Sequence, residues 1–172
     1  VTSSVGQGST FWFRVKLERA EDAAPDEQEQ SPDLEVCLVE HALADNRFLV
    51  VDDNSVNRML LEVMLSRFDG QVTSVEDGRK AVEAVTAGTR FDLVFMDCQM
   101  PVMDGFEATE KIRQWERETG APRLPIIALT AGVLETERQH CIDVGMDAFL
   151  AKPVSFKTLT GTVAHWMSER KK

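Results

Sequence analysis

The sequence predicts an α/β fold in which helices cover both faces of a five-stranded, doubly wound parallel sheet. Two observations lead to this fold class. From residue 46 onward, short apolar runs alternate with longer segments that have the apolar periodicity of helices. The short runs are apolar throughout, which is typical of parallel strands buried on both faces. With 172 residues, 43% of them hydrophobic, the chain can form a core of the required size.

Each apolar run predicts a strand, and a helical segment follows it. The first run ends at Asp52 and Asp53, and Asn54 after them predicts the N-cap of the first helix. The later runs also stop at polar residues, among them Asp97 and Thr130. The predicted strands are residues 48–51, 71–75, 91–96, 125–129 and 148–151. The predicted helices are residues 55–68, 78–87, 106–118, 134–144 and 156–167.

The first 45 residues differ in composition from the rest. Residues 11–17 alternate apolar and polar side chains, which predicts a strand, and Gly6 and Gly8 before it indicate a turn rather than a phosphate-binding loop. Residues 20–33 hold six acidic residues, two prolines and no basic residue, which is typical of a linker. Residues 35–44 fit a helix or a strand equally well. We therefore divide the chain into a strand segment (1–19), an acidic linker (20–45) and an α/β domain (46–171).

The composition argues against several classes of protein. A formal net charge of −10 disfavours a nucleic-acid surface, which is normally basic. No apolar run approaches the length of a membrane span, and no signal peptide opens the chain. Cys37, Cys98 and Cys141 are an odd number without paired spacing, so we interpret them as reduced thiols. We expect a cytoplasmic fragment that starts at Val1 within a longer protein, whose remainder can be membrane-anchored.

Polar side chains follow four of the predicted strands. Asp52 and Asp53 follow the first strand, Asp97 the third, Thr130 the fourth and Lys152 the fifth. Because ligands of open α/β sheets bind beyond the carboxyl ends of the strands, we expect these side chains to meet in one pocket. Clustered carboxylates repel one another unless a cation joins them, and oxygen ligands favour Mg²⁺ or Mn²⁺. A carboxylate can also be the nucleophile that accepts a phosphoryl group.

Four motifs lie at or just after the ends of the predicted strands: Leu49-Val50-Val51-Asp52-Asp53-Asn54, Met96-Asp97-Cys98-Gln99-Met100-Pro101-Val102-Met103-Asp104-Gly105, Ala128-Leu129-Thr130-Ala131 and Lys152-Pro153. These motifs resemble those of the receiver domains of two-component signalling. The resemblance covers roughly residues 46–171 and implies a flavodoxin-like receiver fold with strand order 2-1-3-4-5.

The resemblance implies a phosphoacceptor and a set of metal ligands. Asp97 is similar to the residue that takes the phosphoryl group in this family. Asp53 and Asp97 would bind Mg²⁺ through their carboxylates, Asp52 through water and Gln99 through its backbone carbonyl.

The resemblance also implies a switch. Thr130 and Lys152 would contact the phosphoryl group, and Phe149 would turn inward as Thr130 moves toward the phosphate. Receivers often have Tyr where Phe149 stands, so the hydroxyl of that Tyr is missing here. The peptide bond between Lys152 and Pro153 would be cis, which costs little before proline.

The run Gly6-Gln7-Gly8-Ser9-Thr10-Phe11 resembles the closing strands of a histidine-kinase ATP-binding domain. Together with the linker and the Asp-Asp-Asn-x-x-Asn opening of the α/β domain (Asp52, Asp53, Asn54 and Asn57), this resemblance implies the receiver of a hybrid histidine kinase. The parent would pass a phosphoryl group from its own histidine to Asp97 and then to a histidine phosphotransfer protein. Kinase chemistry is not expected within this chain. None of His41, His140 and His165 is followed by the Glu that is typical of the phosphorylated histidine.

The first predicted helix has more apolar residues than one buried face accommodates. One explanation is that it packs against both the sheet and a neighbouring helix. The explanation we favour is an exposed patch that docks the helices of a partner, because methionine-rich surfaces adapt well to partners. The predicted patch consists of Met59, Leu60, Val63 and Met64.

Two other functions fit parts of the pattern. An aspartate-nucleophile phosphatase of the haloacid dehalogenase type also uses Mg²⁺, but its signature needs a second Asp where Asn54 stands and leaves Asp97 without a role. A phosphate-independent receiver-like module usually lacks an acidic or lysine position of the site, whereas this sequence has them all.

Two further positions bear on how long a phosphoryl group would last. Gln99 and Gly132 lie two residues beyond Asp97 and Thr130, and neither supplies a charge that could position water. We therefore expect a lifetime that is long enough for onward transfer.

Overall fold

Residues 46–132 and 135–169 form the α/β domain in the computed structural model, which also describes residues 2–4 and 8–10. Five parallel strands lie in the order β4-β3-β5-β6-β7. Numbered within the domain, this is the order 2-1-3-4-5, which confirms the predicted fold class. The strands are β3 (Arg47–Val51), β4 (Gln71–Val75), β5 (Leu93–Asp97), β6 (Ile126–Thr130) and β7 (Ala148–Ala151).

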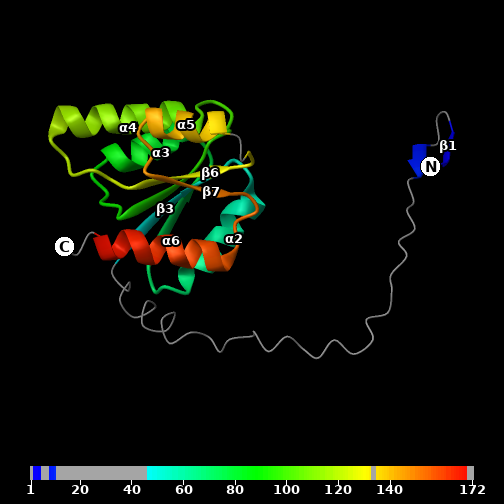
Figure 1. Cartoon of the computed structure of the whole chain (residues 1–172), viewed down its shortest axis with the longest axis horizontal. Coiled ribbons are helices and arrows are strands. Elements are labelled where there is room, and N and C mark those ends of the chain that lie inside the picture. The colour runs from blue at the N-terminus through cyan, green and yellow to red at the C-terminus, as the bar shows by residue number, and fades with distance from the viewer. Residues whose placement is uncertain (1, 5–7, 11–45, 133–134, 170–172) are drawn as a thin grey trace. The chain divides into compact units, whose positions relative to one another are not determined.

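Helices cover both faces of this sheet (Figure 1). One face carries α3, α4 and α5, and the other carries α2 and α6. Because each strand points alternate side chains to opposite faces, the core divides into two buried clusters, one under each helical layer. The helices are α2 (Ser55–Ser66), α3 (Gly78–Thr86), α4 (Gly105–Thr119), α5 (Glu135–Asp143) and α6 (Phe156–Glu169).

The predicted elements agree with the structure to within a few residues at their ends. The third strand begins at Leu93 rather than at residue 91, and the carboxylate of Asp92 just before it accepts a hydrogen bond from the backbone N–H of Arg47 at 2.8 Å. The first helix ends at Ser66 rather than at Phe68, since the chain turns there and Asp69 has a φ of 53°. Among the described helices, none combines the length and apolar character that crossing a membrane requires.

Two short strands in the first segment of the chain form an antiparallel pair. They are β1 (Thr2–Ser4) and β2 (Gly8–Thr10). The sequence indicated only a turn before residue 11, so both strands are additions to the predicted elements. The predicted strand over 11–17, the linker over 20–45 and the apolar stretch over 35–44 lie outside the described residues.

A buried network of charges joins α4 to the segments that precede β6 and β7. Arg113 is 5% exposed, and its guanidinium donates to Glu116 at 2.8 Å and to Asp147 at 2.8 Å. It also donates to the backbone carbonyls of Leu124 and Gly145, each at 2.9 Å. The planar guanidinium has five donors in a fixed geometry, so one side chain fixes the relative positions of three segments.

Candidate functional site

The sheet order brings the predicted polar residues to one edge. Asp52 follows the last residue of β3, beside the end of β5, which terminates with Asp97. Thr130 is the last residue of β6, and Lys152 follows β7. Since these strands are neighbours and parallel, their carboxyl ends lie at the same edge, where open α/β sheets bind ligands.

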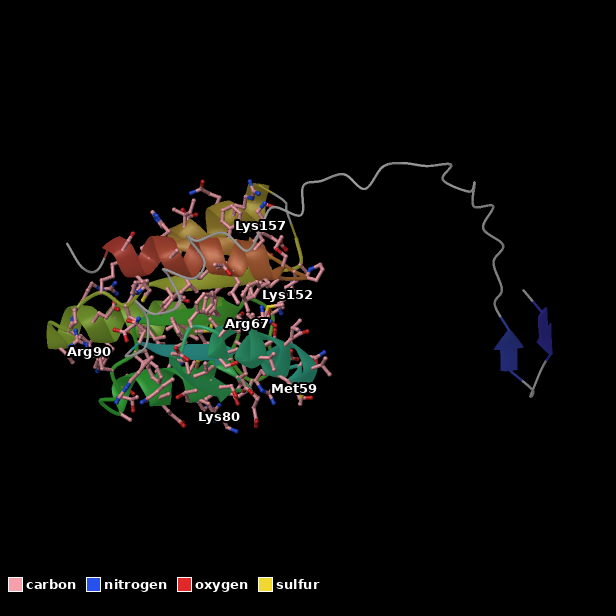
Figure 2. The ribbon with its side chains drawn as sticks, turned by 90° about the horizontal axis from the view of Figure 1, so that it is seen from below. Met59, Arg67, Lys80, Arg90, Lys152 and Lys157 are labelled. Atoms are coloured by element: carbon pink, nitrogen blue, oxygen red, sulfur yellow. The ribbon has the colours of Figure 1, made fainter. Side chains whose placement is uncertain are left out.

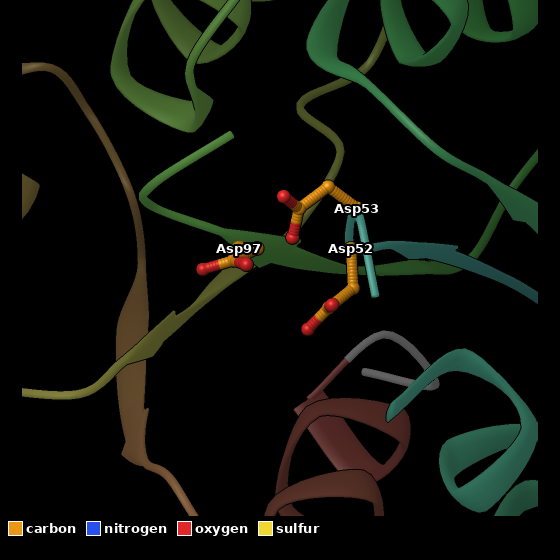
Figure 3. Close-up of side chains that lie close together, drawn as sticks. All are labelled: Asp52, Asp53 and Asp97. Atoms are coloured by element: carbon orange, nitrogen blue, oxygen red, sulfur yellow. The ribbon is translucent and has the colours of Figure 1, made fainter. Parts of the chain in front are cut away.

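Three carboxylates lie close together at this edge (Figure 3). Asp52, Asp53 and Asp97 each offer an oxygen atom that lies within 4.8 Å of the others. Asp52 is fully buried and Asp97 is 6% exposed, whereas Asp53 is exposed to solvent. Hard oxygen donors at this spacing fit a small divalent cation such as Mg²⁺.

Lys152 bridges two of these carboxylates. Its Nζ lies 2.7 Å from Asp52 Oδ2 and 2.7 Å from Asp97 Oδ2. Burial raises the pKa of Asp97, and the hydrogen bond from Lys152 offsets only part of that effect. Burial by itself would lower the pKa of Lys152, but its hydrogen bonds to the two carboxylates outweigh burial and raise it. Lys152 therefore carries its positive charge at the centre of the site.

The first turn of α2 fixes Asp52 in place. The backbone N–H of Asn54 donates to Asp52 Oδ1 at 2.9 Å, and Asn57 Nδ2 lies 3.1 Å from both carboxylate oxygens. Arg58 donates to the backbone carbonyls of Asp52 and Asp53 at 2.7 and 3.1 Å. The contact of Asn57 could have been expected from the Asp-Asp-Asn-x-x-Asn opening, but no sequence pattern signals the role of Arg58.

The remaining predicted residues surround this centre. The backbone N–H of Gln99 donates to Asp97 Oδ1 at 3.2 Å. The Lys152–Pro153 peptide bond is cis. Phe149 is half-buried, and the guanidinium of Arg138 lies 4.4 Å from the centre of its ring. Cys98 and Cys141 are buried free thiols in the core, while Cys37 lies outside the described residues.

Gly105 allows α4 to begin close to the site. A Cβ atom at this position would collide with the backbone carbonyl oxygen of Asp97. Asp104 caps the helix, since its side chain accepts a hydrogen bond from the backbone N–H of Glu107 at 2.8 Å. The Asp-Gly pair therefore sets the path of the chain between Asp97 and α4.

Part of the predicted apolar patch on α2 is exposed. Met59 is 65% exposed, Leu60 46% and Val63 61%. Met64, the fourth residue of the predicted patch, is half-buried and packs partly against the core beneath α2. Val56, at 70% exposed, extends the surface instead. Met59 lies on α2 toward the same end of the domain as Lys152 (Figure 2). We call Val56, Met59, Leu60 and Val63 the α2 patch.

The fold and the site define a class of protein: a doubly wound α/β domain with an acidic, lysine-bridged pocket at the carboxyl edge of its sheet. The family model described as the response regulator receiver domain matches residues 48–164. The chain therefore belongs to this family, and it is a receiver domain of two-component signalling.

Individual relatives agree with this assignment. Hybrid signal transduction histidine kinase A of Dictyostelium discoideum is 44% identical over 118 residues, which are 69% of this chain and 6% of that protein. The chain spans 6–14% of the length of the curated relatives it matches.

Solved structures show the same fold. The receiver domain of the Pseudomonas aeruginosa sensor histidine kinase PA1611, which has a magnesium ion in its active site cleft, is 40% identical with a TM-score of 0.64, covering 72% of this chain and 98% of that one. The structure of the Saccharomyces cerevisiae phosphotransfer protein Ypd1 with the receiver domain of Ssk1 matches at 28% identity and a TM-score of 0.70, covering 73% of this chain and 91% of that one.

Proposed function

We propose that Asp97 accepts a phosphoryl group from a histidine donor, with Mg²⁺ held by Asp52, Asp53 and Asp97. The observation that carries this proposal is the bridge of Lys152 between Asp52 and Asp97, each at 2.7 Å. The bridge leaves the Asp97 carboxylate beside a fixed positive charge, within a cluster of oxygen donors.

Each residue of the site has a role in this proposal. Asp53 and Asp97 bind the metal directly and the backbone carbonyl of Gln99 adds a third ligand. Asp52, whose two oxygens already accept from Asn57 and Lys152, acts through a bound water. A bound Mg²⁺, or Mn²⁺ in its place, would polarise the phosphoryl oxygens and neutralise charge during transfer.

Lys152 and Thr130 contact the transferred phosphoryl group in the same proposal. The Lys152 ammonium is already hydrogen-bonded to the Asp97 carboxylate, so it is in place to pair with a phosphoryl oxygen. Thr130 offers its hydroxyl, and its movement toward the phosphate lets Phe149 turn inward.

The test is to incubate the protein with acetyl phosphate and Mg²⁺ and to measure its intact mass. We expect one phosphoryl adduct, which requires Mg²⁺ and is removed by hydroxylamine, as an acyl phosphate would be. Borohydride reduction followed by peptide mapping should then find homoserine at position 97. An adduct that forms equally well in EDTA, or that maps to another residue, would contradict the proposal.

We propose further that the parent is a hybrid histidine kinase and that the receiver serves a phosphorelay in the cytoplasm. Residues 1–19 would be the end of its ATP-binding domain and 20–45 its linker. The supporting observation is the similarity to receivers of hybrid kinases. The histidine donor is then the kinase itself, and the acceptor is a histidine phosphotransfer protein, the class of partner seen with the Ssk1 receiver.

The α2 patch docks the helical partner in this proposal. It is exposed, and a groove of about 290 Å³ that is lined by Leu60, Asp52 and Lys152 connects it to the site. A helix that covered the patch would bury apolar surface and bring its histidine to the groove.

Met59→Ala combined with Val63→Ala should slow phosphotransfer between the receiver and a cognate phosphotransfer protein about tenfold or more, since both side chains lose apolar contact at the interface. Phosphorylation by acetyl phosphate should stay unchanged, because neither residue touches the site. A matched control is Ile142→Ala, which truncates a side chain that is 60% exposed on α5. Equal transfer rates for the double variant and the wild type would exclude the α2 patch as the docking surface.

The phosphoryl group should last for minutes or longer in the presence of Mg²⁺. Gln99 is exposed and uncharged, and Gly132 has no side chain, so neither position supplies a charged group that activates water. The decay of the intact-mass adduct after removal of acetyl phosphate measures this lifetime directly. A half-life of a few seconds would show that another group positions the water.

The two alternative functions receive less support from the geometry. A phosphatase of the haloacid dehalogenase type would need a carboxylate at Asn54, but this side chain caps α2 by accepting from the backbone N–H of Val56 at 2.9 Å. A phosphate-independent interaction module would not need the Lys152 bridge. Sustained hydrolysis of an added phosphomonoester would favour the first alternative, and absence of any adduct with a histidine donor would favour the second.

A further inference from the structure

The carboxylate of Glu137, in the first turn of α5, lies against the hydroxyl of Thr130. Thr130 Oγ1 is 3.2 Å from Glu137 Oε2 and 3.1 Å from the carbonyl oxygen of Gly132. The hydroxyl has one proton to donate, and a carboxylate is the stronger acceptor of the two. The backbone N–H of Gly132 donates to the same Oγ1 at 3.1 Å. This hydrogen bond occupies a lone pair of the Thr130 oxygen and so fixes the orientation of the hydroxyl.

The negative charge of Glu137 lies near the segment that carries Asp97. A Cβ atom at Gly132 would collide with the Glu137 carboxylate, so the absence of a side chain at Gly132 leaves the space that this carboxylate occupies. Glu137 is held on the hydroxyl of Thr130, the last residue of β6, and β6 pairs with β5 at its end, where Asp97 lies, so the Glu137 carboxylate and a phosphoryl group on Asp97 would lie at the same edge of the sheet.

The helix that carries Glu137 has few other anchors. Among residues 136–143, Cys141 is the one buried side chain. The Arg138 guanidinium stacks on Phe149 at 4.4 Å, but its Nε finds no hydrogen-bond acceptor among the described residues. His140 stacks on Phe106, with 4.2 Å between ring centroids. Two residues of α5 therefore contact the proposed switch: Glu137 contacts Thr130, and Arg138 contacts Phe149.

We propose that Glu137 is a positioning residue that holds the Thr130 hydroxyl away from the phosphoryl site until Asp97 is phosphorylated. This inference rests on the proposed function of Asp97. Phosphorylation replaces one negative charge at Asp97 by roughly two, and Thr130 then has a stronger acceptor in the phosphoryl oxygens. Glu137 loses its hydrogen bond, faces a like charge and leaves the site, and α5 moves with it.

Glu137→Gln tests the charge, because the amide keeps an oxygen that can accept from Thr130. Asp143→Asn makes the same change in net charge near the other end of α5, where Asp143 accepts from Gln139 at 2.8 Å. With acetyl phosphate and Mg²⁺, the initial rate of adduct formation should rise about fivefold or more in Glu137→Gln and stay near the wild-type rate in Asp143→Asn. Damage to the fold cannot raise this rate. A rate in Glu137→Gln that equals or falls below the wild-type rate would overturn the proposal.

A second measurement needs neither metal nor phosphoryl group. Glu137→Ala removes the contact to Thr130, and alanine does not weaken the helix through its propensity. Amide hydrogen exchange over residues 138–143 in EDTA should be faster in this variant than in the wild type or in Asp143→Asn. Unchanged exchange would show that Glu137 does not anchor α5. If the wild type took no phosphoryl group, the proposed role of Asp97 would fail, and this measurement would still decide whether Glu137 holds Thr130.

Discussion

Asp97→Asn should abolish the phosphoryl adduct at every Mg²⁺ concentration. An amide has no carboxylate oxygen with which to attack phosphorus, so the loss is complete rather than partial. The neighbours of the site stay in place, since Lys152 keeps its hydrogen bond to Asp52 and Asn57 still holds Asp52. Intact mass after incubation with acetyl phosphate measures the loss, and an adduct that survives in this variant would mean that a different residue is phosphorylated.

The same variant should be more stable than the wild type in EDTA at neutral pH. The pKa of Asp97 is raised by burial, so its ionised form weakens the fold relative to a neutral side chain. Below pH 3.8, the pKa of Asp97 in the unfolded chain, the carboxyl is protonated and does not weaken the fold. As the pH rises through the higher pKa of the folded protein, Asp97 ionises and this stability is lost. The difference in Tm between the variant and the wild type should therefore shrink in acid, and Mg²⁺ should stabilise the wild type more than the variant.

Asp53→Asn is the matched control for the nucleophile. It makes the same chemical change at the neighbouring carboxylate, which is exposed and belongs to the cation cluster. The adduct should still form in this variant, but it should require a higher Mg²⁺ concentration because one charged ligand is lost. If both variants lost the adduct completely even at high Mg²⁺, the two carboxylates could not be assigned separate roles.

Arg113→Ala should cost about 3–5 kcal/mol of unfolding free energy. The substitution removes the cation that Glu116 and Asp147 share, and the side chains of these two residues are only 8% and 10% exposed. Asp147 then keeps the exposed Arg123 as its cation. The substitution also removes the donor to the carbonyl of Leu124. Since small domains are stable by about 5–15 kcal/mol, this loss is a large share of the total. Urea unfolding at neutral pH measures it.

Two variants define the cause of that loss. Arg117→Ala removes an exposed arginine from the same helix, and its effect should stay within about 0.5 kcal/mol. Arg113→Lys keeps the positive charge but cannot reach several acceptors at once, so its stability should fall between those of Arg113→Ala and the wild type. A loss below about 1 kcal/mol for Arg113→Ala would mean that water replaces the guanidinium in this network.

Local patterns in the sequence determined the elements of the fold and the position of the acidic site. Fully apolar runs between helical segments predict buried parallel strands, because the order of apolar and polar residues within one element reflects which of its faces are buried. Polar residues at the ends of those runs then fall at one edge of the sheet, since parallel strands end together. Asp52, Asp97, Thr130 and Lys152 could be grouped in this way without coordinates, although their roles needed a family resemblance.

Tertiary structure decided the contacts between residues on different elements. Met64 has the same apolar character as Met59, and only the packing of α2 shows that one of them lies toward the core. Arg113 looks like a surface residue of a helix, yet it also donates to acceptors that lie before β6 and β7. Glu137 reaches Thr130 because of where α5 packs on the sheet. Some of these contacts join segments that are distant in sequence, and others depend on how a helix is oriented on the sheet. The local periodicity of the sequence does not encode either kind, because both follow from strand order and packing.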